Sequence, residues 1–334
     1  MAGMPVGAVH QNVPLSNLAV LYRPGFYGFI ADEICPILPV VKESNLYYTW
    51  TQGDFFGTDV SDLTPDRTEP RAIEFAATTA AYQTHRRELA WDISDRERAN
   101  ADDQLRLEQV KQEGVLGRLA LLREMRVEAQ LRENTVTTTV AGESITGGLD
   151  SSMTAAKTAF WDGATTTYNQ IFTDVVKGIT KMRQSIGQKP SHIVIPAAVA
   201  EGIHKSLFFS SSNGPQIVMG SSPADSPAYR NFPLLPPVLW GLQVLVGGEI
   251  KNTAVEGQTA SYSDVWGEVC RILYVTPSPD IERPSVAYTF QSEAVTTRQA
   301  REDKKRVDWF ATGRTIVELV TAAFAGYTIT DCLT

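Results

Sequence analysis

The chain has 334 residues, of which 43% are apolar and 20% are charged, enough to bury at least one large core. A formal charge of −8 argues against a dedicated nucleic-acid binder, which normally carries a basic excess or a basic stripe. No stretch approaches the roughly 20 uninterrupted apolar residues of a membrane helix, and the first thirty residues lack the layout of a signal peptide. Residence in a cytoplasm is the default expectation.

Residues 1–43 mix short apolar groups with prolines and show no sustained period. This composition is typical of an extended arm. A polar disordered tail would be composed differently, so an apolar arm has to find a surface to cover. We expect that surface to belong to a neighbouring subunit.

A β-ribbon is predicted after the arm. Asn45–Thr51 has strand character, residues 52–70 are rich in turn formers, and Ile73–Ile93 has a period of two. The end of the second strand alternates between an apolar and a charged side: Leu89, Trp91 and Ile93 against Arg86, Glu88 and Asp92. The basic cluster His85, Arg86 and Arg87 is expected to form ion pairs with acidic side chains, and contact with DNA would be weak and non-specific.

One long polar helix is predicted next. Ser94 and Glu97 have the spacing of a capping box, and Ala101–Glu133 contains no proline. Its apolar residues recur at threes and fours and form one narrow stripe: Leu105, Val115, Leu116, Leu119, Leu122, Met125, Ala129 and Leu131. The other positions form a lattice of charges of both signs. At ~1.5 Å per residue the helix would be roughly 45 Å long, and it needs neighbours on more than one side.

The second half of the chain reads as an α/β module followed by strands. Residues 134–148 form a loop or short hairpin, and helices are expected over Ser151–Phe160 and over Tyr168–Ile186, where Gly187 is a plausible stop. A buried strand at His192–Ile195 precedes a helix at Ala197–Leu207. Residues 208–237 form a long loop. The remaining strands are expected at Val238–Gly247, Asp264–Thr276, Val286–Phe290, Arg306–Phe310, Thr315–Val320 and Gly326–Cys332.

Signatures of catalysis are absent. The common phosphate-binding, dinucleotide-binding, metalloprotease and serine-hydrolase motifs do not occur, and no Cys/His spacing suggests a metal site. A general base would have to be His192 or His204, with Glu201 on the same helix as His204, but an ordinary strand-end histidine and an exposed helix pair explain them as well. The basic run Arg298–Arg306 contains its own acidic residues and predicts a solvated hairpin or loop. We expect no catalytic, metal-binding or cofactor-binding residues.

The three cysteines, Cys35, Cys270 and Cys332, are far apart and include no Cys-x-x-Cys pair. An odd number at these spacings predicts neither a disulfide framework nor a zinc site. We expect three small core or interface residues.

The order of these elements resembles the major capsid protein of tailed bacteriophages, which has the Hong Kong 97-type fold. The resemblance covers essentially the whole chain. Three stretches are similar to the strand-to-spine-helix junction, to the helix, strand and helix that enter the axial domain, and to the terminal peripheral-domain strands of that family: "AWDISDRERANADDQLRLEQVKQEGVLGRLALLREMRVEAQL", "ITKMRQSIGQKPSHIVIPAAVAEGIHKS" and "SVAYTF...KKRVDWFATGRTIVELVTAAFAGYTITD".

The resemblance implies an α+β fold in five parts. These are an N-terminal arm at 1–43, an extended β-hairpin loop at 44–93, a peripheral domain with the long spine helix at 94–186, an axial domain at 187–280, and peripheral-domain C-terminal strands at 281–334. Many relatives carry a charge-rich helical scaffolding segment ahead of the arm, which this sequence lacks. The Lys and Asn that join subunits covalently in some relatives cannot be matched to positions here.

The resemblance also implies a structural protein and not an enzyme. Homo-hexamers and homo-pentamers would build an icosahedral shell around double-stranded DNA, in a virion capsid assembled in the host bacterial cytoplasm. Expected partners are a separate scaffolding protein, a portal protein and a decoration protein. DNA would be contacted only non-specifically, and no membrane would be involved.

Within such a shell, Trp91, Ile93 and the apolar stripe of the long helix are expected to form intrachain core. The intersubunit contacts are expected at four aromatic residues of the arm and the ribbon tip: Tyr22, Phe26, Phe55 and Phe56.

Two alternatives remain open. An encapsulin-like nanocompartment shell would share the fold and would package a protein in place of a genome. A soluble α/β enzyme using Glu201, His192 and His204 would instead form a small, discrete oligomer.

Overall fold

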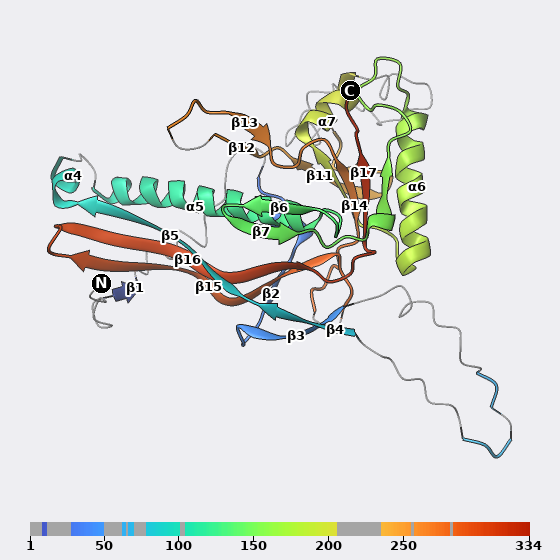
Figure 1. Ribbon diagram of the computed structural model, residues 1–334, viewed down its shortest axis with the longest axis horizontal. Helices are drawn as coiled ribbons and strands as arrows, with labels where there is room; N and C mark the ends of the chain where they lie inside the picture. Colours follow the sequence, from blue (N-terminus) through green and yellow to red (C-terminus); the bar gives the residue numbers. More distant parts are fainter. Residues whose placement is uncertain are drawn as a thin grey trace, which may run out of the picture.

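The computed structural model describes residues 9–11, 28–49, 62–64, 66–69, 78–100, 104–205, 235–254, 257–280 and 283–334. These residues form two main sheets, one elongated and one compact, and a long helix runs from the far end of the first sheet to the second (Figure 1). The sequence-based expectation of a mixed α+β fold with a long helix is confirmed.

The elongated sheet has the order β1-β15-β16-β5, with β2 also paired to β15. Its centre is one long hairpin, β15 (Ala287–Glu302) and β16 (Val307–Val320). β5 (His85–Ser94) pairs antiparallel with β16, β1 (Val9–Gln11) antiparallel with β15, and β2 (Ile37–Pro39) parallel with β15. The separate short strands expected after residue 285 are therefore two long continuous ones, broken only by register shifts between Gln291 and Thr296.

The long helix lies along this sheet. α4 (Asp95–Asn100) follows β5 directly, and α5 (Gln104–Gln130) then runs back over the sheet (Figure 1). Trp91 and Ile93 of β5 are buried with Phe310 of β16, and Leu107 and Val115 of α5 pack onto them. The Trp91 and Phe310 rings stack at 5.4 Å between centroids. The prediction that Trp91 and Ile93 belong to the intrachain core is confirmed.

The compact sheet has the order β10-β11-β9-β14-β17-β8. Its strands are β8 (Thr154–Ala156), β9 (His192–Pro196), β10 (Val238–Leu239), β11 (Leu242–Gly247), β14 (Cys270–Leu273) and β17 (Gly326–Thr330). α6 (Tyr168–Ile186) packs against β14 and β17, and α7 (Ala197–Lys205) against β9 and β11. The core of this unit is the largest apolar cluster of the described chain and includes all three cysteines, each fully buried.

Small elements complete the described chain. Three two-stranded ribbons are formed by β3 (Ser44–Thr49) with β4 (Thr78–Gln83), β6 (Thr137–Val140) with β7 (Glu143–Thr146), and β12 (Ile250–Asn252) with β13 (Tyr262–Asp264). The other two are α2 (Ala31–Ile34) and the 3-10 turn η2 (Ser151–Met153).

The predicted helix over Ser151–Phe160 is wrong. After the single turn of η2, residues 154–156 pair in parallel with β17 as the last strand of the compact sheet. Two backbone N–H groups are satisfied by carboxylates instead of by helical carbonyls, because Ser152 N donates to Asp150 and Thr158 N donates to Asp174.

The neighbouring prediction for Tyr168–Ile186 is confirmed. The helix stops at Gly187, whose φ of 68° is a left-handed conformation that glycine adopts without strain.

The described part of the arm packs on its own chain. Ile30, Ala31, Ile34 and Cys35 are buried in the main core, and α2 contacts α5. The expectation that the whole of 1–43 covers a neighbouring subunit is therefore wrong for residues 30–35. These apolar side chains find an intrachain surface beside the long helix.

Strand pairing also bears on the expected division of the chain. β17 falls in the range 281–334, yet it pairs with β14 of the compact sheet and not with the long hairpin. Strands of 281–334 thus contribute to both sheets, and the chain passes from one sheet to the other at residues 321–325.

Candidate assembly surfaces

The four aromatic residues predicted as intersubunit contacts, Tyr22, Phe26, Phe55 and Phe56, lie outside the described residues and stay predictions. The described part of the ribbon shows how it is built. On one face, Tyr47 and Tyr82 pack against Phe290 of β15, with ring centroids 5.3 and 4.7 Å away. This face anchors the ribbon to the elongated sheet.

The opposite face of the ribbon is apolar and exposed. Leu46 and Tyr48 of β3 are 57% and 39% exposed, and the nearby Val41 is fully exposed. Leu46 lies opposite Ala81, and Tyr48 lies opposite Thr79, so no charged side chain interrupts this face between them. Contiguous apolar groups on an exposed ribbon are typical of a surface that another protein covers.

The β12–β13 ribbon carries a second, smaller apolar surface, which shares its face with two polar side chains. Ile250 and Tyr262 are 54% and 72% exposed, and they lie on the same face as their cross-strand partners, Asp264 and Asn252. Figure 1 shows this ribbon extending away from the compact sheet, on the side of α5 opposite the elongated sheet.

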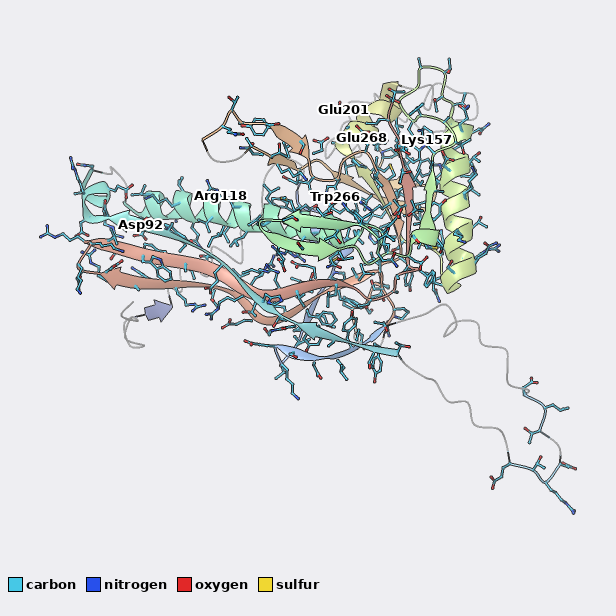
Figure 2. All side chains as sticks on the ribbon, in the orientation of Figure 1. Asp92, Arg118, Lys157, Glu201, Trp266 and Glu268 are labelled. Carbon is cyan, nitrogen blue, oxygen red and sulfur yellow. The ribbon has the colours of Figure 1, made fainter. Side chains whose placement is uncertain are left out.

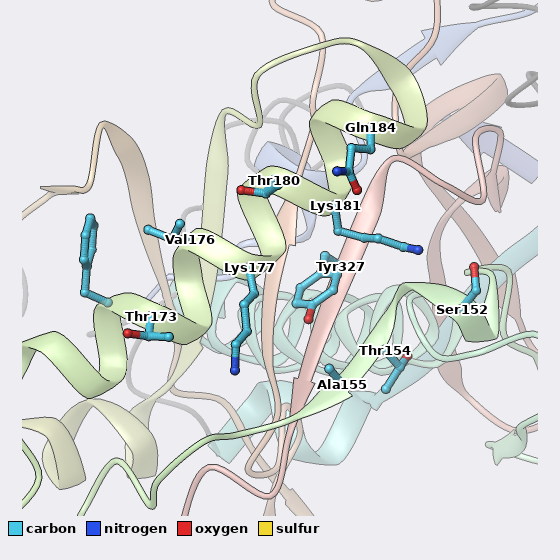
Figure 3. A pocket seen from close by; sticks show the side chains of 11 residues that line it. Ser152, Thr154, Ala155, Thr173, Val176, Lys177, Thr180, Lys181, Gln184 and Tyr327 are labelled. Atoms are coloured by element: carbon cyan, nitrogen blue, oxygen red, sulfur yellow. The ribbon is translucent and has the colours of Figure 1, made fainter.

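A groove of about 600 Å³ follows the outer face of α6. Phe172 and Val176 of α6 are exposed beside it, Lys177 and Lys181 flank it, and Tyr327 of β17 forms its floor together with residues of η2 and β8 (Figure 3). Because β8 is the last strand of the compact sheet, one of its backbone edges has no strand partner among the described residues.

The junction of the two sheets is held by charges buried along the C-terminal half of α5. The Arg126 guanidinium donates to both carboxylate oxygens of Glu318, at 3.1 and 2.9 Å, and both side chains are less than a tenth exposed. Burial opposes ionisation of Glu318, but the charges of Arg126 and Arg123 outweigh it, so the pKa of this carboxyl lies below its ordinary value. This pair fixes α5 to β16.

Glu124 connects three separate segments. Its carboxylate accepts hydrogen bonds from Trp266 Nε1 at 2.8 Å and from the backbone N–H groups of Ala31 and Ile30 at 3.0 and 3.3 Å. Burial raises the pKa of Glu124 to about 7, although these hydrogen bonds act in the opposite direction. Trp266 lies where α5 meets the compact sheet (Figure 2). One carboxylate therefore joins α5, the arm and the segment before β14.

A third buried pair extends the junction. Arg271 of β14 donates to Glu128 at 2.8 Å and to the carbonyl oxygen of Leu131 at 3.1 Å, and Glu128 also pairs with Arg132 at 2.9 Å. These contacts fix the end of α5 to the middle of the compact sheet. Sequence reasoning missed the whole set, because it placed these charges in an exposed lattice.

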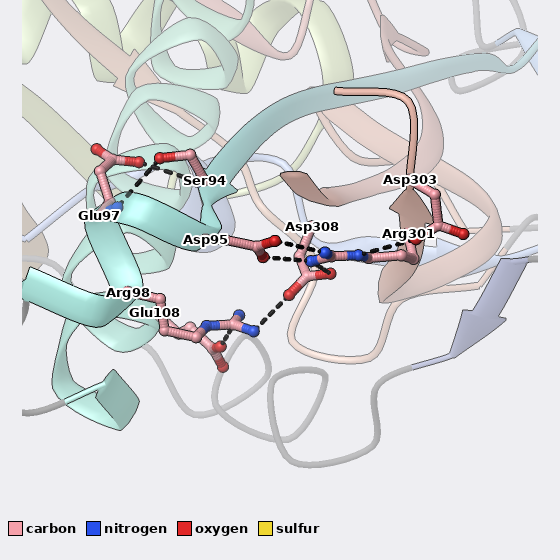
Figure 4. Close-up of polar contacts among 8 residues, drawn as sticks. All are labelled: Ser94, Asp95, Glu97, Arg98, Glu108, Arg301, Asp303 and Asp308. Carbon is pink, nitrogen blue, oxygen red and sulfur yellow. Dashed lines mark hydrogen bonds and ion pairs between the residues drawn. The ribbon is translucent and has the colours of Figure 1, made fainter. Parts of the chain in front are cut away.

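The far end of the molecule is held by charges that are mostly exposed, apart from the buried carboxylate of Asp308. Ser94 and Glu97 form the predicted capping box, with both hydrogen bonds at 3.1 Å. Arg301 donates to both oxygens of Asp95, at 2.6 and 2.7 Å, and also contacts Asp308 (Figure 4). The pKa of Asp95 is lowered by its hydrogen bonds from Arg301. This network ties α4 to the tip of the long hairpin. Within the basic run itself, Arg301 pairs with Asp303 at 3.2 Å and Lys305 pairs with Glu302 at 3.0 Å, which confirms the predicted internal neutralisation.

The predicted ion pairing of the basic ribbon cluster is also confirmed. Arg87 donates to both carboxylate oxygens of Glu143, at 2.6 and 2.8 Å, and Arg86 pairs with Glu88.

The residues considered for catalysis do not form a described site. His192 begins β9, burial lowers its pKa, and its Nδ1 lies 2.7 Å from Ser191 Oγ. Glu201 is exposed on α7 (Figure 2), and the side chain of His204 is outside the described residues.

The described residues contain no cluster of three or more His, Cys, Asp or Glu suited to a metal ion. No helix among them is long and apolar enough to span a membrane.

No protein-family model and no curated protein matches the sequence. Solved structures do match it along almost its full length. A phage-related protein from Bordetella bronchiseptica RB50 has a TM-score of 0.65 at 18% identity, covering 96% of this chain and 97% of that chain. The capsid of cyanophage P-SCSP1u has a TM-score of 0.58 at 11% identity, with 94% and 91% covered. The holo-SrpI encapsulin complex from Synechococcus elongatus has a TM-score of 0.50 at 10% identity, with 90% and 86% covered.

The matched structures include both capsid and encapsulin shells, and these matches cover 94% and 90% of this chain. The order of elements expected from the sequence, with a ribbon, a long helix, a central α/β module and a β-rich end, is present in the described chain. This chain therefore has the Hong Kong 97-type fold of phage capsid proteins, a fold that is also found in an encapsulin.

Proposed function

We propose that this chain is the major capsid protein of a tailed bacteriophage, which self-assembles as hexamers and pentamers into an icosahedral shell around double-stranded DNA. The observation that carries the proposal is the near-complete structural match to the capsid of cyanophage P-SCSP1u, over 94% of this chain. Folds alone do not define functions, so the exposed surfaces have to support the same conclusion.

The surfaces support assembly. The apolar face of the β3–β4 ribbon and the apolar face of the β12–β13 ribbon lie on opposite sides of the molecule's elongated body (Figure 1). Two different apolar surfaces on one chain suit heterologous contacts, in which one surface meets a different surface of the next copy and rotation closes a ring. In a monomer, the apolar side chains of both faces would stay exposed to water, which is unfavourable because no other copy covers them.

The five-part division of the chain belongs to this proposal. Residues 1–43 would be the arm, 44–93 the extended loop, 94–186 the peripheral domain with α5 as the spine helix, and 187–280 the axial domain. For 281–334, the long hairpin would belong to the peripheral domain. β17, which pairs with β14, would belong to the axial sheet, as would β8 and α6 from the range 94–186, because β8 pairs with β17 and α6 packs on both strands.

The same proposal includes the partners and the location. A separate scaffolding protein, a portal protein and a decoration protein would join the shell, and DNA would contact it only non-specifically, as the formal charge of −8 favours. The shell would be assembled in the host bacterial cytoplasm and would form the virion capsid.

An encapsulin-like compartment is the second candidate, because the holo-SrpI encapsulin complex also matches, with a TM-score of 0.50. The content of purified particles separates the two. Nuclease-protected DNA in particles from infected cells would identify a phage capsid, whereas one co-purifying cargo protein without nucleic acid would identify an encapsulin. The enzyme alternative predicts a small discrete oligomer whose activity is lost in His192→Ala.

Electron microscopy of the protein, expressed alone and together with a neighbouring scaffold gene, tests the assembly. We expect hollow shells, or rings of five and six copies. A clean monomer or dimer under both conditions would contradict the proposal and favour the enzyme alternative.

The ribbon surface gives a sharper test. Leu46→Asp with Tyr48→Asp should place charges on the exposed apolar face and abolish shells and rings, while the circular dichroism spectrum stays that of the parent, because neither side chain is in the core. The matched control, Leu46→Ile with Tyr48→Phe, keeps the face apolar and should assemble. If the charged variant assembled like the control, this ribbon face would not be an intersubunit contact.

A further inference from the structure

A polar pocket of about 820 Å³ lies between the elongated sheet, α5 and the segment that contains α2. Its volume is within the range of small-molecule sites. Four guanidinium groups belong to its wall, against two carboxylates at α2: Arg87, Arg123, Arg126 and Arg314, with Asp32 and Glu33. No step of the proposed assembly uses this pocket.

Two of these arginines face each other across neighbouring strands. Arg87 of β5 and Arg314 of β16 are register partners in an antiparallel pair, so their side chains leave the same face of the sheet. Like charges in directly opposed positions destabilise a sheet. Beside them, Ala294 lines the pocket and carries only a methyl group, so it fills little of the space between the sheet and α5.

The arginines differ in how their charge is compensated. Arg87 is bound by Glu143, Arg126 by Glu318, and Arg123 by Asp32. Both Glu143 and Glu318 lie outside the pocket wall. Among the residues that the structure describes, none forms a hydrogen bond or an ion pair with Arg314, whose five N–H groups remain without a protein acceptor.

Two further buried donors near Arg314 form no hydrogen bond. Arg87 Nε and Arg123 Nε have no hydrogen-bond acceptor in the described chain, although Arg123 Nε lies 3.8 Å from Glu318 Oε1, and the Arg123 side chain is only 4% exposed. Burial, together with the charge of Arg123, lowers the pKa of Arg314 to about 10. A cation held in this environment would be stabilised by an anion that accepts several N–H groups at once.

We propose that the pocket binds a tetrahedral oxyanion of the phosphate class, held between Arg87 and Arg314 on the sheet and contacted by Arg123 from α5. Guanidinium forks match the oxygen spacing of such groups and bind them in a bidentate manner. Since the ligand would contact both the sheet and α5, it would strengthen the packing of the long helix on the elongated sheet. This inference does not depend on the proposed shell function.

Inorganic phosphate titrated into the purified chain tests the site, with thermal unfolding and isothermal titration as readouts. Sodium chloride is used to keep ionic strength equal across the series, because ion pairs also respond to salt. We expect phosphate to bind and to raise the unfolding temperature in a saturable way. A short single-stranded oligonucleotide at the same phosphate concentration separates the sources. Stabilisation by the oligonucleotide alone would mean that the site takes a nucleic-acid backbone phosphate and would overturn a free-ion site.

Variants localise the effect. Arg314→Gln should abolish saturable binding, and Arg118→Gln, which changes an exposed arginine on the same helix α5, should bind like the parent. Arg314→Lys keeps the charge but loses the fork, so its affinity should fall about tenfold. That variant decides the matter if Arg314→Gln does not fold. The proposal would be overturned if the parent did not bind phosphate in a saturable way. It would also be overturned if the parent and Arg314→Lys bound phosphate with equal affinity.

Discussion

The two halves of α5 place their charged side chains in different environments, although they belong to one continuous helix. The N-terminal half packs one apolar stripe, including Leu107 and Val115, against Phe310 and its neighbours, and keeps its charges in water. The C-terminal half is enclosed by both sheets and by α2, and four of its charged residues are buried: Arg123, Glu124, Arg126 and Glu128. The first half is an ordinary amphipathic helix, and the second half is packed between the two sheets with its charged side chains buried.

The difference has an energetic consequence. An exposed ion pair gains little, because water screens it and holding two long side chains in place costs entropy. A buried pair gains little in net terms as well, but removing one partner leaves an uncompensated charge away from water. Substitutions should therefore have small effects at the exposed charges of the far end, such as Asp95 and Glu97, and large effects at the buried charges of the junction.

The largest effect is expected for Glu318→Ala. Glu318 is 3% exposed, and its loss leaves Arg126 buried without an acceptor, which should cost about 3–5 kcal/mol of unfolding free energy. Urea denaturation of the variant beside the parent measures this. A loss below about 1 kcal/mol would mean that the junction behaves like the exposed end.

The matched control removes both charges. Arg126→Met combined with Glu318→Leu replaces the pair by apolar side chains of similar size, so the double variant should be far closer to the parent than Glu318→Ala is. If the double variant were as unstable as the single one, packing and not charge burial would explain the loss.

The next effect concerns Glu124 and pH. Its folded pKa of about 7 lies above the ordinary value of 4.5, so the folded chain binds more protons than the unfolded chain between these pH values. The contribution of this group to stability is therefore full at low pH and is lost as the pH rises from about 4.5 to about 7, by about 3 kcal/mol in total. Glu124→Gln should lack this loss, and unfolding free energies of both proteins across that range measure the difference.

A second variant tests whether the pH at which stability is lost follows the pKa of Glu124. Trp266→Phe removes the N–H donor that favours the ionised carboxylate, so the loss of stability should extend to higher pH than in the parent. Parallel pH profiles for the parent and Glu124→Gln would show that this carboxyl does not titrate in that range.

The same contrast explains how much could be predicted from the sequence. The N-terminal half of α5 and the Trp91 strand follow from periodicity, because one side of each element faces water, and the start of α4 follows from its capping box. Beyond Leu119 the apolar residues cease to recur only at threes and fours, since Leu121 and Val127 lie outside the predicted stripe. Apolar residues on more than one face of a helix indicate that the helix is enclosed by other elements. This indication was overlooked, because the charged residues of α5 have the spacing of a surface ion-pair lattice.

Two other incorrect predictions concern segments whose structure depends on contacts with distant parts of the chain. β8 was taken for a helix because three residues are too few to display a period of two, and its strand state is set by pairing with β17, which lies about 170 positions later in the sequence. Residues 30–35 were assigned to a neighbouring subunit because an apolar segment without a period indicates only that a surface exists. Which surface it covers depends on Glu124 and on the core beneath α2.

The smallest effect is expected at Ser94, in the exposed end of the molecule. Its hydroxyl accepts the Glu97 N–H at 3.1 Å, and α4 has no buried residue, so little else depends on this contact (Figure 4). Ser94→Ala should cost about 1 kcal/mol, as the loss of an N-cap usually does, whereas Ser94→Asp keeps an acceptor and should unfold like the parent. Urea denaturation under the conditions used for Glu318→Ala makes the two regions directly comparable. A loss of unfolding free energy at Ser94 as large as that at Glu318 would mean that α4 and the hairpin tip unfold together with the junction. The exposed and the buried contacts along α5 would then contribute equally to stability.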